Sequence, residues 1–72
     1  MEIDPSVDCY GTIKVYFPLK AYGFISREKG RDLFFYRTSF DNEQSIIEGN
    51  PVKFKIKRSE EGLSAIDITR NG

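Results

Sequence analysis

The sequence contains no histidine, no tryptophan and a single cysteine, Cys9. One cysteine cannot form an intramolecular disulfide, and without histidine a structural zinc site is not expected. The absence of histidine also removes the side chain that most often serves as a general acid or base. We therefore expect no metal or other cofactor, no enzymatic activity, and a reducing, cytoplasmic location.

Long apolar runs are also absent. No stretch approaches the roughly 18 apolar residues that a membrane span needs, and residues 1–5 lack the basic start and apolar stretch of a signal peptide. The 72 residues have room for one small domain. Folding at this size buries only about 60–65% of the unfolded chain's surface, so the core is thin. We expect no membrane association and no small-molecule substrate.

The net charge is zero, but the charges are unevenly distributed. Residues 14–37 carry six basic side chains against two acidic ones, and residues 53–58 add four more basic side chains. The other segments are acidic. Positive charge concentrated in two segments is typical of a protein with a local binding surface.

Apolar residues alternate with polar ones at a period of two, which predicts strands. Val52, Phe54 and Ile56 alternate with three lysines, and Ile66 and Ile68 alternate with polar neighbours. Three further strands, rich in aromatic and β-branched residues, are expected within residues 10–17, 22–26 and 33–37. No amphipathic helix is evident.

Turn-forming residues separate these runs. Pro18 ends the first run, since proline cannot donate to a central ladder. Gly30 can supply the positive φ of a hairpin turn at residues 28–31. Residues 48–51 and 60–62 separate the later strands, and residues 38–47 form a longer link with one helical turn near residues 38–40.

Five short strands at regular spacing predict a small closed sheet, because closure removes exposed strand edges. The fold class is therefore all-β, a five-stranded antiparallel Greek-key barrel of the OB type. An SH3-like open sandwich is the alternative. Residues 1–9 are interpreted as an N-terminal tail and residues 10–70 as the domain.

Eight of the ten aromatic residues lie between residues 10 and 36. The strand period places apolar neighbours on opposite sides of the expected hairpin. We assign Ile25, Leu33 and Phe35 to the core. The opposite, solvent side then carries four rings, namely Tyr22, Phe24, Phe34 and Tyr36.

Four rings that face water need a partner to cover them. The alternative is that these rings pack under a loop while Ile25 and Phe35 face outward. Basic residues at the margin favour the first interpretation. Single-stranded nucleic acid needs both features, because bases stack on rings and phosphates contact cations, at about 1–3 kcal/mol for each stacked base.

The marginal residues come from the first and third of these strands and from the turn that follows the first. Lys14 and Tyr16 lie on the outer face of the first strand if Ile13 and Val15 face inward. Lys20 stands just before the first pair of rings, and Arg37 stands just after the second pair.

The sequence G-T-I-K-V-Y-F-P-L-K-A-Y-G-F-I of residues 11–25 resembles the opening of cold-shock domains, approximately G-x-V-K-W-F-N-x-x-K-G-F/Y-G-F-I. D-L-F-F-Y at residues 32–36 is similar to the family's D-V-F-V-H, and residues 48–54 are similar to its E-G-x-x-V-x-F. The resemblance covers about residues 10–69. It implies an OB barrel that binds single-stranded RNA or DNA, with contacts at Lys14, Lys20, Tyr22, Phe24, Asp32, Phe34 and Tyr36.

Several positions depart from the family pattern. Val15 stands where the family has tryptophan, so one stacking platform is missing, at a cost of about 1–3 kcal/mol. Phe17 replaces asparagine, Ala21 replaces glycine, Tyr36 replaces histidine and Arg37 replaces phenylalanine. We therefore expect a divergent cold-shock domain with weaker or altered affinity.

The residues predict a protein that binds single-stranded RNA or DNA, and the resemblance implies that it acts as an RNA chaperone or cold-shock-like regulator. A protein-interaction or self-associating OB module with weakened nucleic-acid binding is the alternative. A monomer is expected, and a dimer remains open. The lysines at residues 53, 55 and 57 are interpreted as a solvated face, with a second phosphate track as the alternative. The predicted binding residues are Lys14, Tyr16, Lys20, Tyr22, Phe24, Asp32, Phe34, Tyr36 and Arg37.

Overall fold

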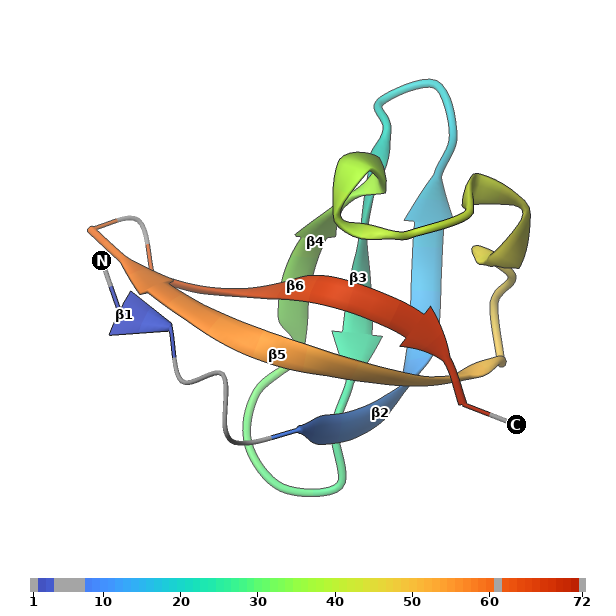
Figure 1. The fold of residues 1–72 in the computed structure, drawn as a ribbon. Coiled ribbons are helices and arrows are strands. Elements are labelled where there is room, and N and C mark those ends of the chain that lie inside the picture. The colour runs from blue at the N-terminus through green and yellow to red at the C-terminus, as the bar shows by residue number, and fades with distance from the viewer. Residues whose placement is uncertain (1, 4–7, 61, 72) are drawn as a thin grey trace.

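The computed structural model describes residues 2–3, 8–60 and 62–71, with side chains from residue 8 onward. Strands make up most of this part of the chain, and no helix within it is long and apolar enough to cross a membrane. The elements are β1 (Glu2–Ile3), β2 (Cys9–Phe17), β3 (Tyr22–Ser26), β4 (Leu33–Tyr36), the 3-10 helices η1 (Arg37–Ser39) and η2 (Glu43–Ser45), β5 (Pro51–Ser59) and β6 (Gly62–Arg70) (Figure 1).

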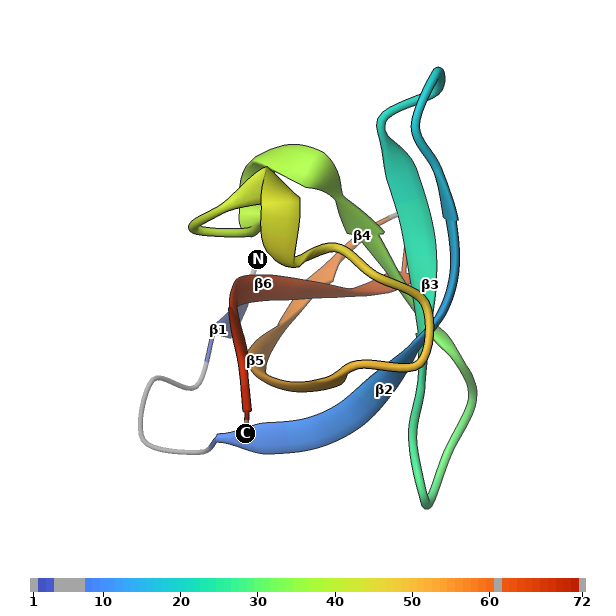
Figure 2. The same cartoon turned by 90° about the vertical axis from the view of Figure 1, so that its right-hand side faces the viewer.

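The strands close into a barrel in the order β5-β2-β3-β4-β6, because β6 pairs back with β5. Neighbouring strands are antiparallel except β4 and β6, which are parallel. The predicted five-stranded OB-type barrel is therefore confirmed. The short strand β1 adds to the edge of β5, a pairing that the sequence did not predict. The β2–β3 and β3–β4 loops lie at opposite ends of β3 (Figure 2).

The strand ends follow the predicted turn residues. Strand β2 ends at Phe17, immediately before Pro18. Gly30 and Gly49 have φ of 100° and 94°, conformations that glycine adopts without steric cost. The helical turn expected near residues 38–40 is present one residue earlier, as η1, whereas η2 was not predicted.

The core is a cluster of apolar side chains inside the barrel. Ile25 and Phe35 are fully buried and Leu33 is 1% exposed, as predicted, so the alternative in which Ile25 and Phe35 face outward is wrong. Position 23, which pairs with Phe35, has room only for glycine, because an added Cβ would lie 2.3 Å from the carbonyl oxygen of Val15. The buried residues are Ile13, Ile25, Leu33, Phe35, Phe40, Ile46, Val52, Phe54, Ala65 and Ile68.

A β-bulge interrupts the alternation of β2. The register with β3 shifts between Ile13 and Val15, which leaves Lys14 as the extra residue. Beyond the bulge, Tyr16 packs against the core, with its ring stacked on Phe35 at a centroid distance of 6.1 Å. Before the bulge the prediction holds, since Ile13 is buried and Lys14 is exposed. Beyond it the predicted orientation, with Tyr16 outward and Val15 inward, is wrong, because one extra residue exchanges the two faces.

A second irregularity lies in β6. The sequence pattern placed Ile66 and Ile68 on one face, but the structure buries Ala65 and Ile68 and leaves Ile66 half-buried. The register with β5 shifts at this point, and Asp67 has φ of 50°. The left-handed backbone at Asp67 lets the side chains of Ala65 and Ile68, three positions apart, both point into the core.

Ala21, in the β2–β3 turn, has a left-handed backbone conformation. Its φ is 62°, and its amide donates to the Phe17 carbonyl oxygen at 2.9 Å. A left-handed conformation costs an L-residue with a Cβ roughly 1–2 kcal/mol, whereas glycine adopts it freely. We expect Ala21→Gly to raise the free energy of unfolding by about 1 kcal/mol, measured by urea denaturation. Asp67→Gly is the matched control and gains less, because aspartate tolerates positive φ better than alanine. A destabilised Ala21→Gly protein would contradict this account.

Candidate nucleic-acid interface

The outer surface of β2, β3 and β4 carries a continuous group of aromatic rings, which we call the ring face. Antiparallel pairing sets Phe24 opposite Phe34 and Tyr22 opposite Tyr36. All four side chains lie on the side of the sheet away from the core, as predicted, and none is among the buried residues. The ring face consists of Phe17, Tyr22, Phe24, Phe34 and Tyr36.

Phe34 lies at the centre of the ring face. Its ring centroid is 4.6 Å from that of Tyr36, 5.2 Å from that of Tyr22 and 5.8 Å from that of Phe24. These separations fall in the range that aromatic pairs prefer, about 4.5–7 Å, and the tilted or edge-on arrangements are the favoured ones. The rings therefore cover one another partly, while Tyr36 remains 55% exposed.

Phe17 is a ring of this face that the sequence pattern did not predict. It pairs with Tyr22 across β2 and β3, and their ring centroids are 5.4 Å apart. Phe17 is 40% exposed, and the Lys20 ammonium lies 5.9 Å from its ring centroid. The sequence carried a signal in the substitution of phenylalanine for the family's asparagine. Its direction could not be assigned without the bulge at Lys14.

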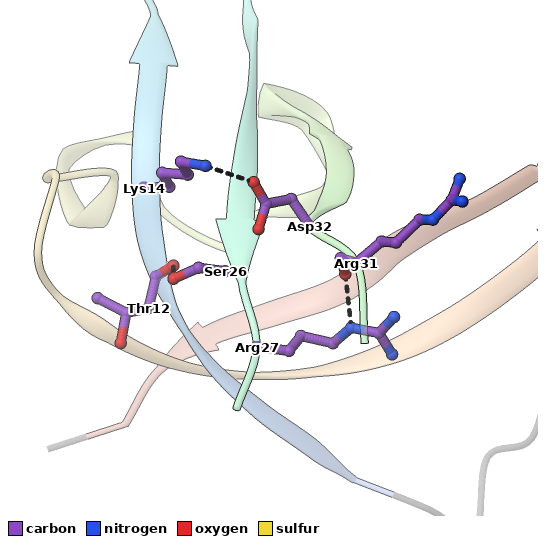
Figure 3. A network of polar contacts seen from close by, with 6 residues as sticks. All are labelled: Thr12, Lys14, Ser26, Arg27, Arg31 and Asp32. Atoms are coloured by element: carbon purple, nitrogen blue, oxygen red, sulfur yellow. Dashed lines mark hydrogen bonds and ion pairs between the residues drawn. The ribbon is translucent and has the colours of Figure 1, made fainter. Parts of the chain in front are cut away.

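An ion pair borders the ring face beside the β3–β4 loop. Lys14 Nζ lies 2.7 Å from Asp32 Oδ2, and both side chains are exposed, by 60% and 37% (Figure 3). Exposed pairs of this kind contribute about 0–1 kcal/mol, so the pair can exchange its partners at little cost. Arg27 Nε donates to the Arg31 carbonyl oxygen at 2.9 Å, which ties the two ends of the loop together.

Two predicted binding residues lie in a different environment. Arg37 Nη1 contacts Glu43 Oε2 at 3.1 Å, and the Tyr16 hydroxyl donates to the same oxygen at 3.5 Å. Desolvation by burial, reinforced by the negative charge of Glu43, raises the pKa of Tyr16 above its ordinary value. The structure thus places Tyr16 and Arg37 in a polar cluster next to η2, with Tyr16 on the core side of the barrel.

A hollow of about 360 Å³ adjoins the ring face on its other side, between β4 and the β5–β6 hairpin. Lys57 lines it, so one member of the predicted lysine row lies next to the rings. Lys55 instead contacts Asp8 at 2.7 Å, a hydrogen bond that holds the pKa of Asp8 below its usual range. The lining residues are Phe34, Tyr36, Lys57, Ser59, Gly62, Leu63 and Ser64.

The surface combines flat apolar rings with cations at several margins. Among residues 8–60 and 62–71, no group of three or more histidine, cysteine, aspartate or glutamate side chains could hold a metal ion. Exposed rings with marginal ammonium groups can stack bases and neutralise phosphates. The structure brings seven of the nine predicted residues to this surface or its margin, namely Lys14, Lys20, Tyr22, Phe24, Asp32, Phe34 and Tyr36.

Known proteins resemble this sequence across nearly the whole barrel. The family model of the 'Cold-shock' DNA-binding domain matches residues 9–71. A Retron Se72 cold shock-like protein from Salmonella heidelberg is 36% identical over 63 residues, which cover 83% of this chain and 94% of that protein. The Major cold shock protein of Streptococcus pyogenes serotype M18 is 32% identical over 62 residues, covering 83% and 92%. The Major cold shock protein CspA of Pseudomonas aeruginosa is 35% identical over 60 residues, covering 81% and 87%.

The match includes both motifs of the ring face and the strands that close the barrel. Domains of this family bind single-stranded nucleic acids. The chain therefore belongs to the cold-shock domain family.

Proposed function

We propose that this protein binds single-stranded RNA or DNA on the ring face, by stacking bases on its rings and holding phosphates with the cations at its margin. The observation that carries the proposal is the outward orientation of Tyr22, Phe24, Phe34 and Tyr36, in direct contact with one another. A solvent-facing group of rings is costly unless a partner covers it. Membership of the cold-shock family supports nucleic acid as that partner.

The same arrangement supports a role as an RNA chaperone or cold-shock-like regulator. Stacking accepts any base, because every base has a flat π-face. A protein that binds only the unpaired strand shifts a hairpin equilibrium toward the open form by mass action. The function is one of binding rather than catalysis. The lone thiol of Cys9 fits a reducing compartment, and we propose a cytoplasmic location on that ground.

The central rings give the most direct test of this proposal. We expect Phe34→Ala and Phe24→Ala each to weaken binding of a fluorescein-labelled heptathymidine by about 5- to 150-fold, which corresponds to one lost stack of about 1–3 kcal/mol. Fluorescence anisotropy gives the affinity, and thermal unfolding shows that each variant is folded. Tyr10→Ala is the matched control, because Tyr10 is 57% exposed and pairs with Lys53 on β5, away from the ring face.

If both variants bind the strand like the wild-type protein, the ring face is not the binding surface. A dimer that forms with increasing protein concentration and ignores the oligonucleotide would instead support the self-associating module. Sedimentation velocity with and without heptathymidine distinguishes these outcomes.

The charges around the ring face predict the salt dependence of binding. Lys14, Lys20, Arg31 and Lys57 lie at its margins, so two to four phosphate contacts are available. Each phosphate contact with a single strand contributes about −0.7 to the slope of log K against log salt. We expect a slope of roughly −1.5 to −3, measured by titration between about 50 and 200 mM KCl. A slope near zero would contradict phosphate contact.

Hairpin opening tests the chaperone role separately. We expect the protein to lower the melting temperature of a weak RNA hairpin carrying a fluorophore and a quencher, because it binds the open strand alone. Phe34→Ala should lose this effect together with binding. An unchanged melting curve at saturating wild-type protein would show that the protein does not prefer the open strand to the folded hairpin, which would contradict the chaperone role.

A further inference from the structure

The outer face of β5 carries lysines at alternate positions, which we call the lysine row, namely Lys53, Lys55 and Lys57. Their neighbours Val52 and Phe54 are buried on the opposite face. Lys57 pairs with Ser64 on β6, and Ser64 pairs with Phe34 on β4. Because directly paired residues share a face of the sheet, the lysine row begins beside the central ring of the ring face and leads away from it.

Both described parts of the acidic N-terminal segment, residues 1–8, lie against this row. The segment carries three acidic side chains and no basic one, whereas residues 53–58 carry four basic side chains and no acidic one. Strand β1 pairs with β5, so that Glu2 is opposite Arg58 and Ile3 is opposite Lys57 (Figure 1). At the other end of the segment, Asp8 Oδ1 lies 2.7 Å from Lys55 Nζ. The chain therefore places its own negative charge on the basic strand.

We propose that the lysine row is a second phosphate-binding surface, used by strands that extend beyond the ring face, and that the acidic N-terminal segment competes with phosphates for it. The proposal rests on the proposed function and adds an intramolecular competitor to it. The sequence pattern is compatible with a solvated face or with a phosphate track. The position of Asp8 favours the track, because a carboxylate and a phosphate oxygen accept from an ammonium group in the same way.

The lysine row is connected to the rings and is long enough for more than one phosphate. Phe34, Tyr36 and Lys57 line the same hollow, between β4 and the β5–β6 hairpin. Lys53 and Lys57 are four residues apart on β5, which corresponds to about 13 Å. A strand stacked on Phe34 therefore reaches Lys57 first, and it reaches the other two lysines only if it is longer.

The contact of Asp8 with the row is weak enough to be displaced. The hydrogen bond from Lys55 lowers the pKa of Asp8, and the charges of Lys55 and Lys53 lower it further, so Asp8 is influenced by two lysines of the row. The Asp8 side chain is nevertheless 42% exposed, and ion pairs at such exposure contribute little to stability. A phosphate can replace Asp8 on Lys55 without disturbing the barrel, but a long strand binds less tightly than it would without this competitor.

The experiment compares the affinities of heptathymidine and the longer undecathymidine by fluorescence anisotropy, since one OB barrel binds about 4–16 nucleotides. We expect Asp8→Asn to bind undecathymidine about two- to fivefold more tightly than the wild-type protein, because a charged carboxylate no longer competes for Lys55. Heptathymidine affinity should change less. Thermal unfolding shows that the variant is folded.

Asp41→Asn is the matched control. It removes the same charge from an exposed aspartate in the link between η1 and η2, away from β1 (Figure 1). The ratio of its affinities for the two strands should equal that of the wild-type protein. An Asp8→Asn protein with unchanged undecathymidine affinity, or with an equal gain for both strands, would overturn the proposal.

A second arm tests whether Asp8 acts through the lysine row. In a Lys55→Gln background, Asp8→Asn should bring no gain in undecathymidine affinity, because the lysine for which it competes is gone. A gain of the same size with and without Lys55 would mean that Asp8 acts only through the net charge of the protein, and the competition would be disproved.

Phe34→Ala separates this inference from the proposed function, because it removes a ring and leaves the lysine row intact. If Phe34→Ala weakens binding of both strands while Asp8→Asn has no effect on undecathymidine, the competitor is wrong and the ring face remains the binding surface. If Phe34→Ala binds both strands like the wild-type protein, the proposed function itself fails.

Discussion

The antiparallel pairing of β3 with β4 is the constraint on which the rest of this structure depends. Four consecutive residue pairs alternate between the two faces of these strands, from Tyr22 with Tyr36 to Ile25 with Leu33. The same pairing therefore builds the core and the ring face at once. A slip of one residue would bury the rings and expose Ile25 and Phe35, so the hydrophobic core fixes the position of every ring.

Close packing at Gly23 strengthens this constraint. Its missing side chain lets the Phe35 ring lie against the sheet, since an added Cβ would meet the Phe35 ring at 2.8 Å. The Phe35 ring in turn packs against the rings of Tyr16 and Phe40, at centroid distances of 6.1 Å and 5.3 Å. The ring face is thus the outer side of a tightly packed layer and not a set of loosely held side chains.

Two irregularities, in β2 and in β6, change which side chains face the core without changing how the strands pair. Beyond the bulge at Lys14, the half-buried Val15 and the exposed Phe17 lie on the outer face, and Tyr16 packs against the core. Around Asp67 the irregularity brings Ala65 and Ile68 into the core together. Neither bulge alters which strands pair, but each decides which side chains a ligand can reach.

Periodicity and turn chemistry determined most of this protein from the sequence. Once Ile25, Leu33 and Phe35 are assigned to the core, strict alternation on β3 and β4 leaves only the outer face for the four rings, so the sequence alone predicts their placement. Pro18, Gly30 and Gly49 marked strand ends because their backbone preferences are local. The motifs over residues 11–25 and 32–36 identified the family because each is a continuous stretch of sequence, the first covering β2 and β3 and the second covering β4.

Only the tertiary structure decided the orientation of Tyr16, Val15 and Phe17 and the partner of Arg37. A bulge depends on how one strand fits two neighbours at once, and β2 pairs with β3 at one end and with β5 at the other. The Arg37–Glu43 contact likewise depends on η2, whose position follows from the packing of Phe40 and Ile46 over the core. These features arise from contacts between distant segments, and a two-residue period read along one strand contains no information about them.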